Sequence, residues 1–312
     1  MGLLPPLRMR LPVALLRATM LELAILAAHM IVYPSGLIPE RRASRPTPAG
    51  AAPPGSSDSS GSSGSSDSPD SPGAAHGLPD TPDLAETHGS AAPPYLPARS
   101  PRHPPAVLLH GFVDNRSVFV LLRRSLARQD GRPVESLNYS PLTCDIRAAA
   151  ELLGRHVEEI CARTGRPRVD IVGHSLGGLI ARYYVQRLGG DGRVRTLVTL
   201  GTPHTGTRVA PLASAHPIVR QMRPGSAVIE ELGLPAPGCR TRFVSFWSDL
   251  DQIMVPLETA RLEHPDLMVR NVRVSGIGHL ALPVHPAVAA GIREALEMSG
   301  AEAESPGAVS AA

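Results

Sequence analysis

The feature that most constrains this chain is a serine enclosed by glycines between an apolar run and an amphipathic one. The sequence G-H-S-L-G at residues 173–177 follows the apolar residues 169–172 and opens a helical pattern over residues 176–188. In a strand–turn–helix context, G-x-S-x-G is typical of a sharp turn that exposes the serine hydroxyl. Glycines are needed there because a side chain would collide with the neighbouring strand or helix. We predict that Ser175 is a nucleophile on such a turn; the alternative is a glycine-rich connection with a surface serine.

Composition divides the 312 residues into a short N-terminal segment, a linker, one folded domain and a tail. Residues 1–39 contain a mostly apolar run at 11–33, which is long enough to cross a bilayer but includes Arg17, Glu22 and His29. A retained membrane anchor, a cleaved signal peptide and an interfacial or protein-packed helix remain open for this segment. The first two predict an extracytoplasmic protein, either membrane-anchored or secreted.

The next segment, residues 40–103, is rich in proline, serine, glycine and aspartate. Such a segment buries too little apolar surface to offset the entropy of ordering its backbone. We expect a disordered linker that tethers the domain; a disordered region without a spacer role is the alternative. The folded domain is assigned to residues 104–299, and residues 300–312 are expected to form a disordered tail.

The composition argues against several classes of partner and cofactor. Net charge is +3, but all 31 basic residues are arginine and only 3% of residues are aromatic, so we expect no nucleic-acid partner. The three cysteines, at 144, 161 and 239, include no C-x-x-C pair, which argues against a zinc site or a redox pair. Cys144 and Cys161 are expected to flank one helix and lie too far apart to bond. We therefore prefer Cys144–Cys239 as the pairing in an oxidising compartment.

Apolar runs alternate with amphipathic segments through the domain, which predicts a mostly parallel sheet of about six strands flanked by helices. We expect strands at residues 106–110, 134–138, 169–173, 194–200, 241–247 and 269–274. We expect helices at residues 118–129, 145–163, 176–188 and 286–298. Asp145 is placed to cap the second of these helices. Ligands of such sheets bind beyond the carboxyl ends of the strands, where every motif below falls.

A serine hydroxyl needs a neighbouring base, and that base needs a carboxylate to orient it. After a G-x-S-x-G turn, the expected chain order is serine, acid, histidine. Asp251 follows the strand expected at 241–247 and precedes Pro256, which would fix the turn. We prefer Asp251 as the acid and keep Asp249 as the alternative.

The histidine is sought after the last strand. His279 lies there in a glycine-bearing loop, followed by apolar residues, and we predict that it is the base. His285 is held in reserve. His264 precedes a proline and is expected to lie in solvent.

The negative oxygen that develops when a hydroxyl attacks a carbonyl needs two donors fixed in advance. The main-chain N–H of Leu176, directly after the serine, is one candidate. The N–H of Phe112, in the loop after the first strand, is the other, and Gly111 lets the main chain approach the substrate. We expect His110 and His174 to pack and hydrogen-bond rather than to act as the base.

The residues after the fourth strand are expected to line the site without taking part in chemistry. G-T-P-H-T-G-T at 201–207 predicts a rigid wall, and His204 has no second ligand at a spacing that suits a metal. The segment from Gly201 to Thr241 is too short for a large cap. We expect it to form either a small flap or acyl-chain wall, or a surface helix that buries one face.

The chain resembles the bacterial triacylglycerol lipases and esterases of the α/β-hydrolase superfamily. The resemblance spans residues 104–298 and rests on G-H-S-L-G-G at 173–178, G-T-P-H at 201–204, H-G-F at 110–112, Asp251 before Ile253, and Gly278-His279. It implies an α/β-hydrolase fold with a small or absent lid, hydrolysis of carboxylic esters and no organic cofactor. It also implies catalytic roles for Ser175, Asp251 and His279.

We therefore expect a monomeric serine hydrolase that cleaves lipid-like esters through an acyl-enzyme and associates with a membrane through its N-terminal segment. An acyltransferase with the same three side chains is one alternative, since it differs only in excluding water. An inactive hydrolase fold that serves as an anchored binding module is another. A peptidase or a thioesterase also remains open, because the three side chains do not select the acyl substrate.

Overall fold

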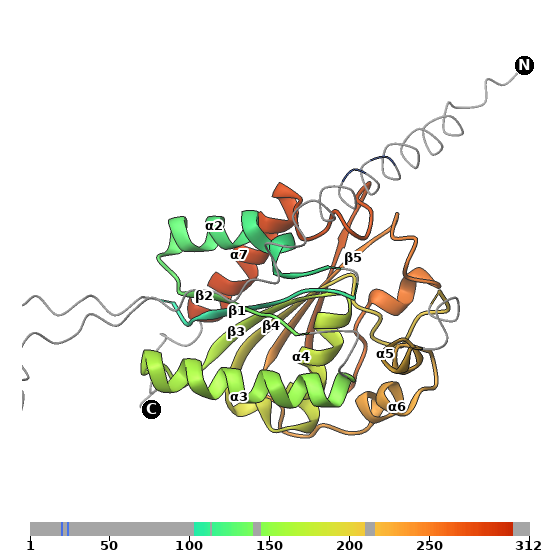
Figure 1. Ribbon diagram of the computed structural model, residues 1–312, viewed down its shortest axis with the longest axis horizontal. Helices are drawn as coiled ribbons and strands as arrows, with labels where there is room; N and C mark the ends of the chain where they lie inside the picture. The colour runs from blue at the N-terminus through green and yellow to red at the C-terminus, as the bar shows by residue number, and fades with distance from the viewer. Residues whose placement is uncertain are drawn as a thin grey trace, which may run out of the picture. The chain divides into compact units, whose positions relative to one another are not determined.

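The computed structural model describes residues 20, 24, 103–112, 114–139, 145–209 and 216–301 (Figure 1). Within these residues, six strands form one parallel sheet in the order β2-β1-β3-β4-β5-β6. The strands are β1 (Ala106–Leu109), β2 (Val134–Leu137), β3 (Val169–His174), β4 (Val194–Leu200), β5 (Arg242–Ser248) and β6 (Met268–Val274). The expected parallel sheet of about six strands is confirmed, and every strand boundary lies within one residue of its expected position.

The central strands are covered on both faces, which is why they read as continuous apolar runs in the sequence. Every residue of β1 and β3 is buried, whereas the edge strand β6 alternates between exposed and half-buried residues. Asp170 is a buried acidic residue within β3. Its carboxylate accepts hydrogen bonds from Arg195 at 2.9 and 2.6 Å and forms a second ion pair with the buried Arg132. A buried charge at this place is tolerated because it is paired.

Four longer helices flank the sheet and agree with the expected pattern. They are α2 (Val120–Asp130), which follows the 3-10 turn η2 (Arg116–Phe119), α3 (Ile146–Thr164), α4 (Leu176–Arg187) and α7 (Pro286–Ala301). The Asp145 side chain accepts a hydrogen bond from the N–H of Ala148 at 2.7 Å, so the expected cap of α3 is confirmed. Gly165 ends α3 at a φ of 68°, a conformation that glycine adopts without strain.

The helices form two layers, one on each face of the sheet (Figure 1). α2 and α7 cover one face, where their apolar side chains pack with those of alternate strand residues such as Leu108 and Val172. α3 and α4 cover the other face and pack with Leu109 and Ile171. This three-layer arrangement leaves the carboxyl ends of the strands accessible to loops, as expected for a parallel α/β sheet.

Two short helices, α5 (Pro217–Gln221) and α6 (Ala227–Gly233), lie between β4 and β5. Their apolar side chains are buried in the same cluster as those of α3 and α4 (Ile218, Val219, Met222, Val228 and Leu232). The buried Arg182 of α4 holds this region by donating to the main-chain oxygens of His204 at 2.9 Å and Leu232 at 2.8 Å. The described part of the segment is therefore packed on the domain, as in the second of the two expected arrangements; residues 210–215 lie outside the description.

Several expectations fall on residues that the structure does not describe. They are the N-terminal segment apart from Met20 and Ala24, most of the linker, the tail after residue 301, and Cys144 with its expected pairing. By compactness the chain divides into residues 1–39 with 99–312, and residues 40–98, of which none is described. Across the described residues, the model contains no helix that combines the length and apolar character needed to span a membrane. Cys161 and Cys239 are free thiols.

Candidate active site

Ser175 occupies the turn between β3 and α4 in a strained conformation. Its φ of 52° and ψ of −117° make it the one non-glycine residue with positive φ among those described. Such a conformation costs free energy and persists only when the surroundings enforce it. The glycines on either side are required as the sequence predicts. A Cβ on Gly173 would lie 2.6 Å from the main-chain N of Gly178, and one on Gly177 would lie 2.5 Å from the main-chain O of Leu109.

The main chain of the turn is fixed by residues of β4 and the loop that follows it. The N–H of Ser175 donates to the oxygen of Leu200 at 2.9 Å, and the hydroxyl of Thr202 donates to the oxygen of Ser175 at 3.0 Å. These bonds hold the serine at the carboxyl end of the sheet, where its side chain is largely buried but not sealed from solvent.

Asp251 and His279 come from two different loops and meet beside this turn. Oδ2 of Asp251 lies 2.7 Å from Nδ1 of His279, and neither side chain is exposed by more than 5%. Oδ1 of Asp251 accepts hydrogen bonds from the N–H groups of Ile253 at 3.0 Å and Met254 at 3.1 Å. The carboxylate is thus held by three donors, so the orientation of the imidazole that it faces is fixed as well.

Two further contacts place the His279 ring near Ser175. The ring centroid of His279 is 4.9 Å from that of His174, the residue directly before Ser175. Gly201, which directly follows Leu200, lies against the histidine–aspartate pair. A Cβ on Gly201 would be 2.9 Å from Oδ2 of Asp251 and 3.0 Å from Nδ1 of His279. The structure therefore gathers the three predicted side chains at one end of the sheet.

The two predicted donors for a developing oxyanion lie on either side of the serine. Leu176 is the first residue of α4, and the first N–H groups of a helix have no partner within that helix. Phe112 follows Gly111, whose Cβ, if present, would be 3.3 Å from the Cβ of Ser175. The ring of Phe112 packs edge-on against His216, with their centroids 5.8 Å apart. The loop after β1 thus runs beside the serine, as the prediction requires.

The alternative acids and bases are engaged elsewhere. Asp249 accepts hydrogen bonds from Arg273 at 2.9 Å and from the N–H of Gly276 at 3.1 Å. His285 accepts a hydrogen bond from the N–H of Ala287 at 3.3 Å, at the beginning of α7. His264 lies 3.1 Å from the main-chain oxygen of Leu234, in an exposed contact. These contacts support loops and a helix end.

Two more histidines that the sequence analysis weighed are buried and pack against neighbouring side chains. His110 stacks on Tyr139, with centroids 4.4 Å apart, and burial lowers its pKa. His204 is fully buried beside Thr199 and Ser245, and burial followed by the charge of Arg182 lowers its pKa well below the usual value. Both are neutral packing residues. Among the described residues, no group of three or more histidine, cysteine or acidic side chains is arranged to hold a metal ion.

Sequence reasoning did not predict that Asp114 lies at this site. Its Oδ2 is 2.8 Å from Nδ1 of His174, in a second buried histidine–aspartate pair. The only signal in the sequence was its position four residues after His110, in the loop expected to carry an oxyanion donor.

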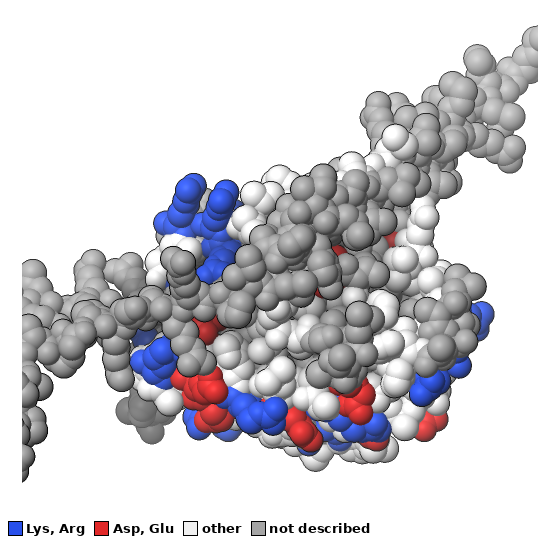
Figure 2. Space-filling view, in the orientation of Figure 1, with Lys and Arg blue, Asp and Glu red and all other residues white. Residues whose placement is uncertain are grey.

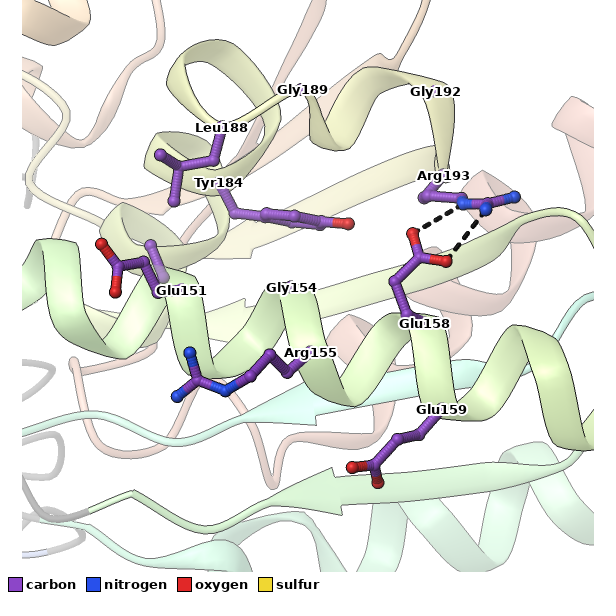
Figure 3. A pocket seen from close by; sticks show the side chains of 11 residues that line it. Glu151, Gly154, Arg155, Glu158, Glu159, Tyr184, Leu188, Gly189, Gly192 and Arg193 are labelled. Carbon is purple, nitrogen blue, oxygen red and sulfur yellow. Dashed lines mark hydrogen bonds and ion pairs between the residues drawn. The ribbon is translucent and has the colours of Figure 1, made fainter.

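Two further features of the domain, its surface charge and an open hollow, lie outside the candidate site. Figure 2 shows acidic and basic side chains interleaved over the face that α3 covers, with a separate basic group over α2. An open hollow lies between α3, α4 and η3 (Gly190–Gly192), with Tyr184 and the Glu158–Arg193 ion pair in its lining (Figure 3). Because Arg193 directly precedes β4, this hollow is at the amino end of that strand, whereas Ser175 follows the carboxyl end of β3. It is not part of the candidate site.

Comparison with known proteins places these features in context. The family model for palmitoyl protein thioesterase matches residues 105–255. Two curated triacylglycerol lipases, from Pseudarthrobacter phenanthrenivorans and Burkholderia plantarii, are each 38% identical to the chain over 60 residues. Those matches cover 19% of this chain and 18% and 16% of the two lipases, so the chain spans less than a fifth of the length of either relative.

Solved structures resemble the domain over a larger part. Aspergillus fumigatus lipase B has a TM-score of 0.56 at 18% identity, covering 62% of this chain and 52% of the lipase. A Pyrobaculum calidifontis esterase has a TM-score of 0.50 at 15% identity, covering 66% of this chain and 79% of the esterase. At these identities the similarity concerns the fold alone.

Proposed function

We propose that this chain, which has the fold of the α/β-hydrolases and is similar to lipases and esterases, hydrolyses carboxylic esters with Ser175 as nucleophile, His279 as base and Asp251 as the residue that orients the base. The observation that carries this proposal is the 2.7 Å contact between Asp251 and His279 beside a serine held at a φ of 52°. Three groups of this kind, in the chain order serine, acid, histidine, form the arrangement that activates a hydroxyl in this fold.

In the proposed reaction, Nε2 of His279 accepts the hydroxyl proton of Ser175 while Oγ forms a bond to the ester carbonyl carbon. The electron pair of the carbonyl moves to its oxygen, which the N–H groups of Phe112 and Leu176 stabilise. When the oxyanion collapses, the bond to the alcohol oxygen breaks and His279 returns its proton to the leaving alcohol. Water then repeats the sequence on the acyl-enzyme and releases the acid. Asp251 stabilises the imidazolium that forms in each half.

We propose lipid-like esters as the substrate class. The curated relatives named triacylglycerol lipase and the match to the palmitoyl protein thioesterase model support a substrate with an apolar acyl chain. Oxygen esters and thioesters both present a carbonyl to the same nucleophile, so thioesters belong in the test panel. An acyltransferase would pass the same acyl-enzyme to an alcohol. Product analysis with added acceptor alcohols distinguishes transfer from hydrolysis.

The proposal is tested by Ser175→Ala in the full chain. We expect turnover of p-nitrophenyl esters to fall by at least about a thousandfold and labelling by a fluorophosphonate probe to disappear. Ser125→Ala is the matched control, because Ser125 on α2 accepts a hydrogen bond from Arg293 on α7 at 2.8 Å and should leave both readouts unchanged. Labelling that persists in the folded Ser175 variant would overturn the assignment. Absence of both turnover and labelling in the folded wild-type chain would favour an inactive binding module.

The cellular site is also a proposal. The apolar run at residues 11–33 supports an extracytoplasmic domain that is membrane-anchored or secreted. Protease treatment of intact cells tests this placement. Digestion of the domain at the cell surface, or its recovery from the medium, supports the proposal, and protection inside intact cells contradicts it.

A further inference from the structure

The second histidine–aspartate pair, His174 with Asp114, uses both nitrogens of its ring. Nδ1 of His174 lies 2.8 Å from Oδ2 of Asp114, and Nε2 of the same ring lies 3.2 Å from the main-chain oxygen of His279. The side chains of His174 and Asp114 are exposed by 1% and 0%, so water does not compete for these contacts. One imidazole thus connects the loop after β1, the serine turn and the loop that carries the proposed base.

The two atoms that His174 faces determine where its protons must be. A main-chain carbonyl oxygen has no hydrogen and accepts only, and an ionised carboxylate also accepts only. Both ring nitrogens of His174 must therefore donate, which a neutral imidazole cannot do because it carries a single N–H. Satisfying both contacts requires the imidazolium form, whose charge is balanced by Asp114.

The surroundings of the ring are consistent with a balanced charge pair. The titratable groups that face His174 in the described structure are Asp114 from the loop after β1, His279 at a centroid distance of 4.9 Å, and His110 at the end of β1. Burial lowers the pKa of His110, which keeps that ring neutral. Asp251 contacts His279 at Nδ1. Asp114 is thus the carboxylate in direct contact with this ring.

The pair also touches the serine turn through Gly111. A Cβ on Gly111 would lie 2.9 Å from Oδ2 of Asp114, 3.1 Å from Nδ1 of His174 and 3.3 Å from the Cβ of Ser175. The missing side chain lets the loop that bears Phe112 close over the pair. A shift of His174 would therefore displace both the main chain of His279 and the loop that carries the proposed oxyanion donor Phe112.

We propose that Asp114 and His174 form a buried carboxylate–imidazolium pair that positions His279 by a hydrogen bond to its main-chain oxygen. This inference rests on the proposed function of Ser175 and His279. Asp114 and His174 are positioning residues, because they act through the backbone of the base and do not contact the reacting atoms. The prediction is a loss in the chemical step with little change in substrate binding.

The kinetic test uses Asp114→Asn in the full chain, with Asp266→Asn as the matched control. Asp266 lies in the loop before β6 and accepts a hydrogen bond from the N–H of Ala236. The control variant therefore loses the same negative charge at a place outside the site. We expect Asp114→Asn to lower kcat by about ten- to a hundredfold with KM within about twofold, as a displaced but present base would do. We expect Asp266→Asn to leave both constants unchanged. An unchanged kcat in a folded Asp114→Asn protein overturns the inference.

The charge state is tested directly by ¹⁵N NMR of the histidine rings in the wild-type chain, with His174→Gln used to assign the resonances. We expect both ring nitrogens of His174 to appear as N–H nitrogens at about pH 7, because each of them faces an acceptor oxygen. A neutral His174 ring at about pH 7 overturns the charged pair, and this readout does not depend on whether any variant folds.

Running Ser175→Ala beside these proteins separates the positioning role from the proposed function. Wild-type activity in Ser175→Ala defeats the proposed function, whereas its inactivity together with an unaffected Asp114→Asn defeats only the positioning role.

Discussion

The two buried histidine–aspartate pairs near Ser175 have similar contacts between the ring and the carboxylate, but we propose different roles for them. The Nδ1–Oδ2 distances are 2.7 Å for His279 with Asp251 and 2.8 Å for His174 with Asp114. Nε2 of His174 is directed at a main-chain oxygen, so it has a proton and no lone pair to offer a hydroxyl. The comparison teaches that a histidine–aspartate contact does not by itself identify a base; the environment of the second nitrogen decides.

The pairs also differ in how they are built into the chain. Asp251 is fixed within its own loop by the N–H groups of Ile253 and Met254, and it reaches a histidine 28 residues further on. Asp114 contacts a histidine 60 residues further on, the residue directly before the serine. The residue next to the nucleophile in sequence is therefore used as a support, and the proposed base comes from 105 residues beyond it.

The sharpest way to break this comparison is to neutralise each aspartate in turn. Asp251→Asn should lower kcat by about ten-thousandfold, because an amide no longer selects the tautomer of His279 that accepts the serine proton. Asp114→Asn should cost far less, since His279 and Asp251 stay in contact. Steady-state kinetics on one p-nitrophenyl ester, with melting temperatures to confirm folding, measures both. Equal losses in the two variants would contradict the assignment of different roles.

The second prediction concerns Gly201, which lies against the Asp251–His279 pair. Gly201→Ala adds a Cβ within 3.0 Å of both Asp251 and His279, so the pair must shift to make room. A displacement of this kind lowers kcat by about a hundredfold. The backbone also contributes a cost of about 1–2 kcal/mol in stability, because φ at Gly201 is 51°.

Gly238→Ala is the control that separates these two effects. Gly238 has a φ of 77° and nothing within 4 Å of its missing Cβ, so alanine there carries the backbone strain without the collision. We expect a similar loss of stability and full activity. If Gly238→Ala loses as much activity as Gly201→Ala, strain rather than the contact with the pair is the cause.

The sequence was sufficient for the features that depend on local pattern. Apolar runs bounded by glycine or charged residues located the strands, and the strand–turn–helix context of Ser175 predicted the collisions that Gly173 and Gly177 avoid. The acid and histidine positions followed from chain order, and the structure brings Asp251 and His279 into contact. Their catalytic roles remain predictions until Ser175 and its partners are tested.

Features that depend on contacts between distant segments were not predictable in this way. Asp114 follows a turn glycine in an ordinary-looking loop, and no periodicity shows that it meets His174. Arg182 lies on an amphipathic helix and would be expected in solvent, yet it is buried and donates to His204 and Leu232. Such pairings arise from how the loops converge at the sheet, which single-residue propensities do not encode.

His204 extends the comparison to a histidine without an aspartate. Its pKa is lowered well below the usual value, first by burial and then by the charge of Arg182, so the folded protein holds it neutral. A group with a lowered histidine pKa binds fewer protons in the folded state than in the unfolded state at acidic pH. Its contribution to stability is therefore complete above about pH 6.5 and is lost as the pH falls below that value.

The smallest predicted effect follows from this sign. Between about pH 7.5 and about pH 5.5, His204 should remove up to ~1.4 kcal/mol of unfolding free energy, and His204→Gln should make the decline correspondingly shallower. Urea unfolding of both proteins at about pH 7.5, 6.5 and 5.5 measures the difference, and the remaining buried histidines contribute equally to both. His110, whose pKa burial also lowers, should add a decline of the same direction that His204→Gln leaves in place. Parallel curves for the two proteins would mean that His204 becomes protonated in the folded state as readily as in the unfolded chain. In that case, the contrast between paired and unpaired buried histidines would not hold for this residue.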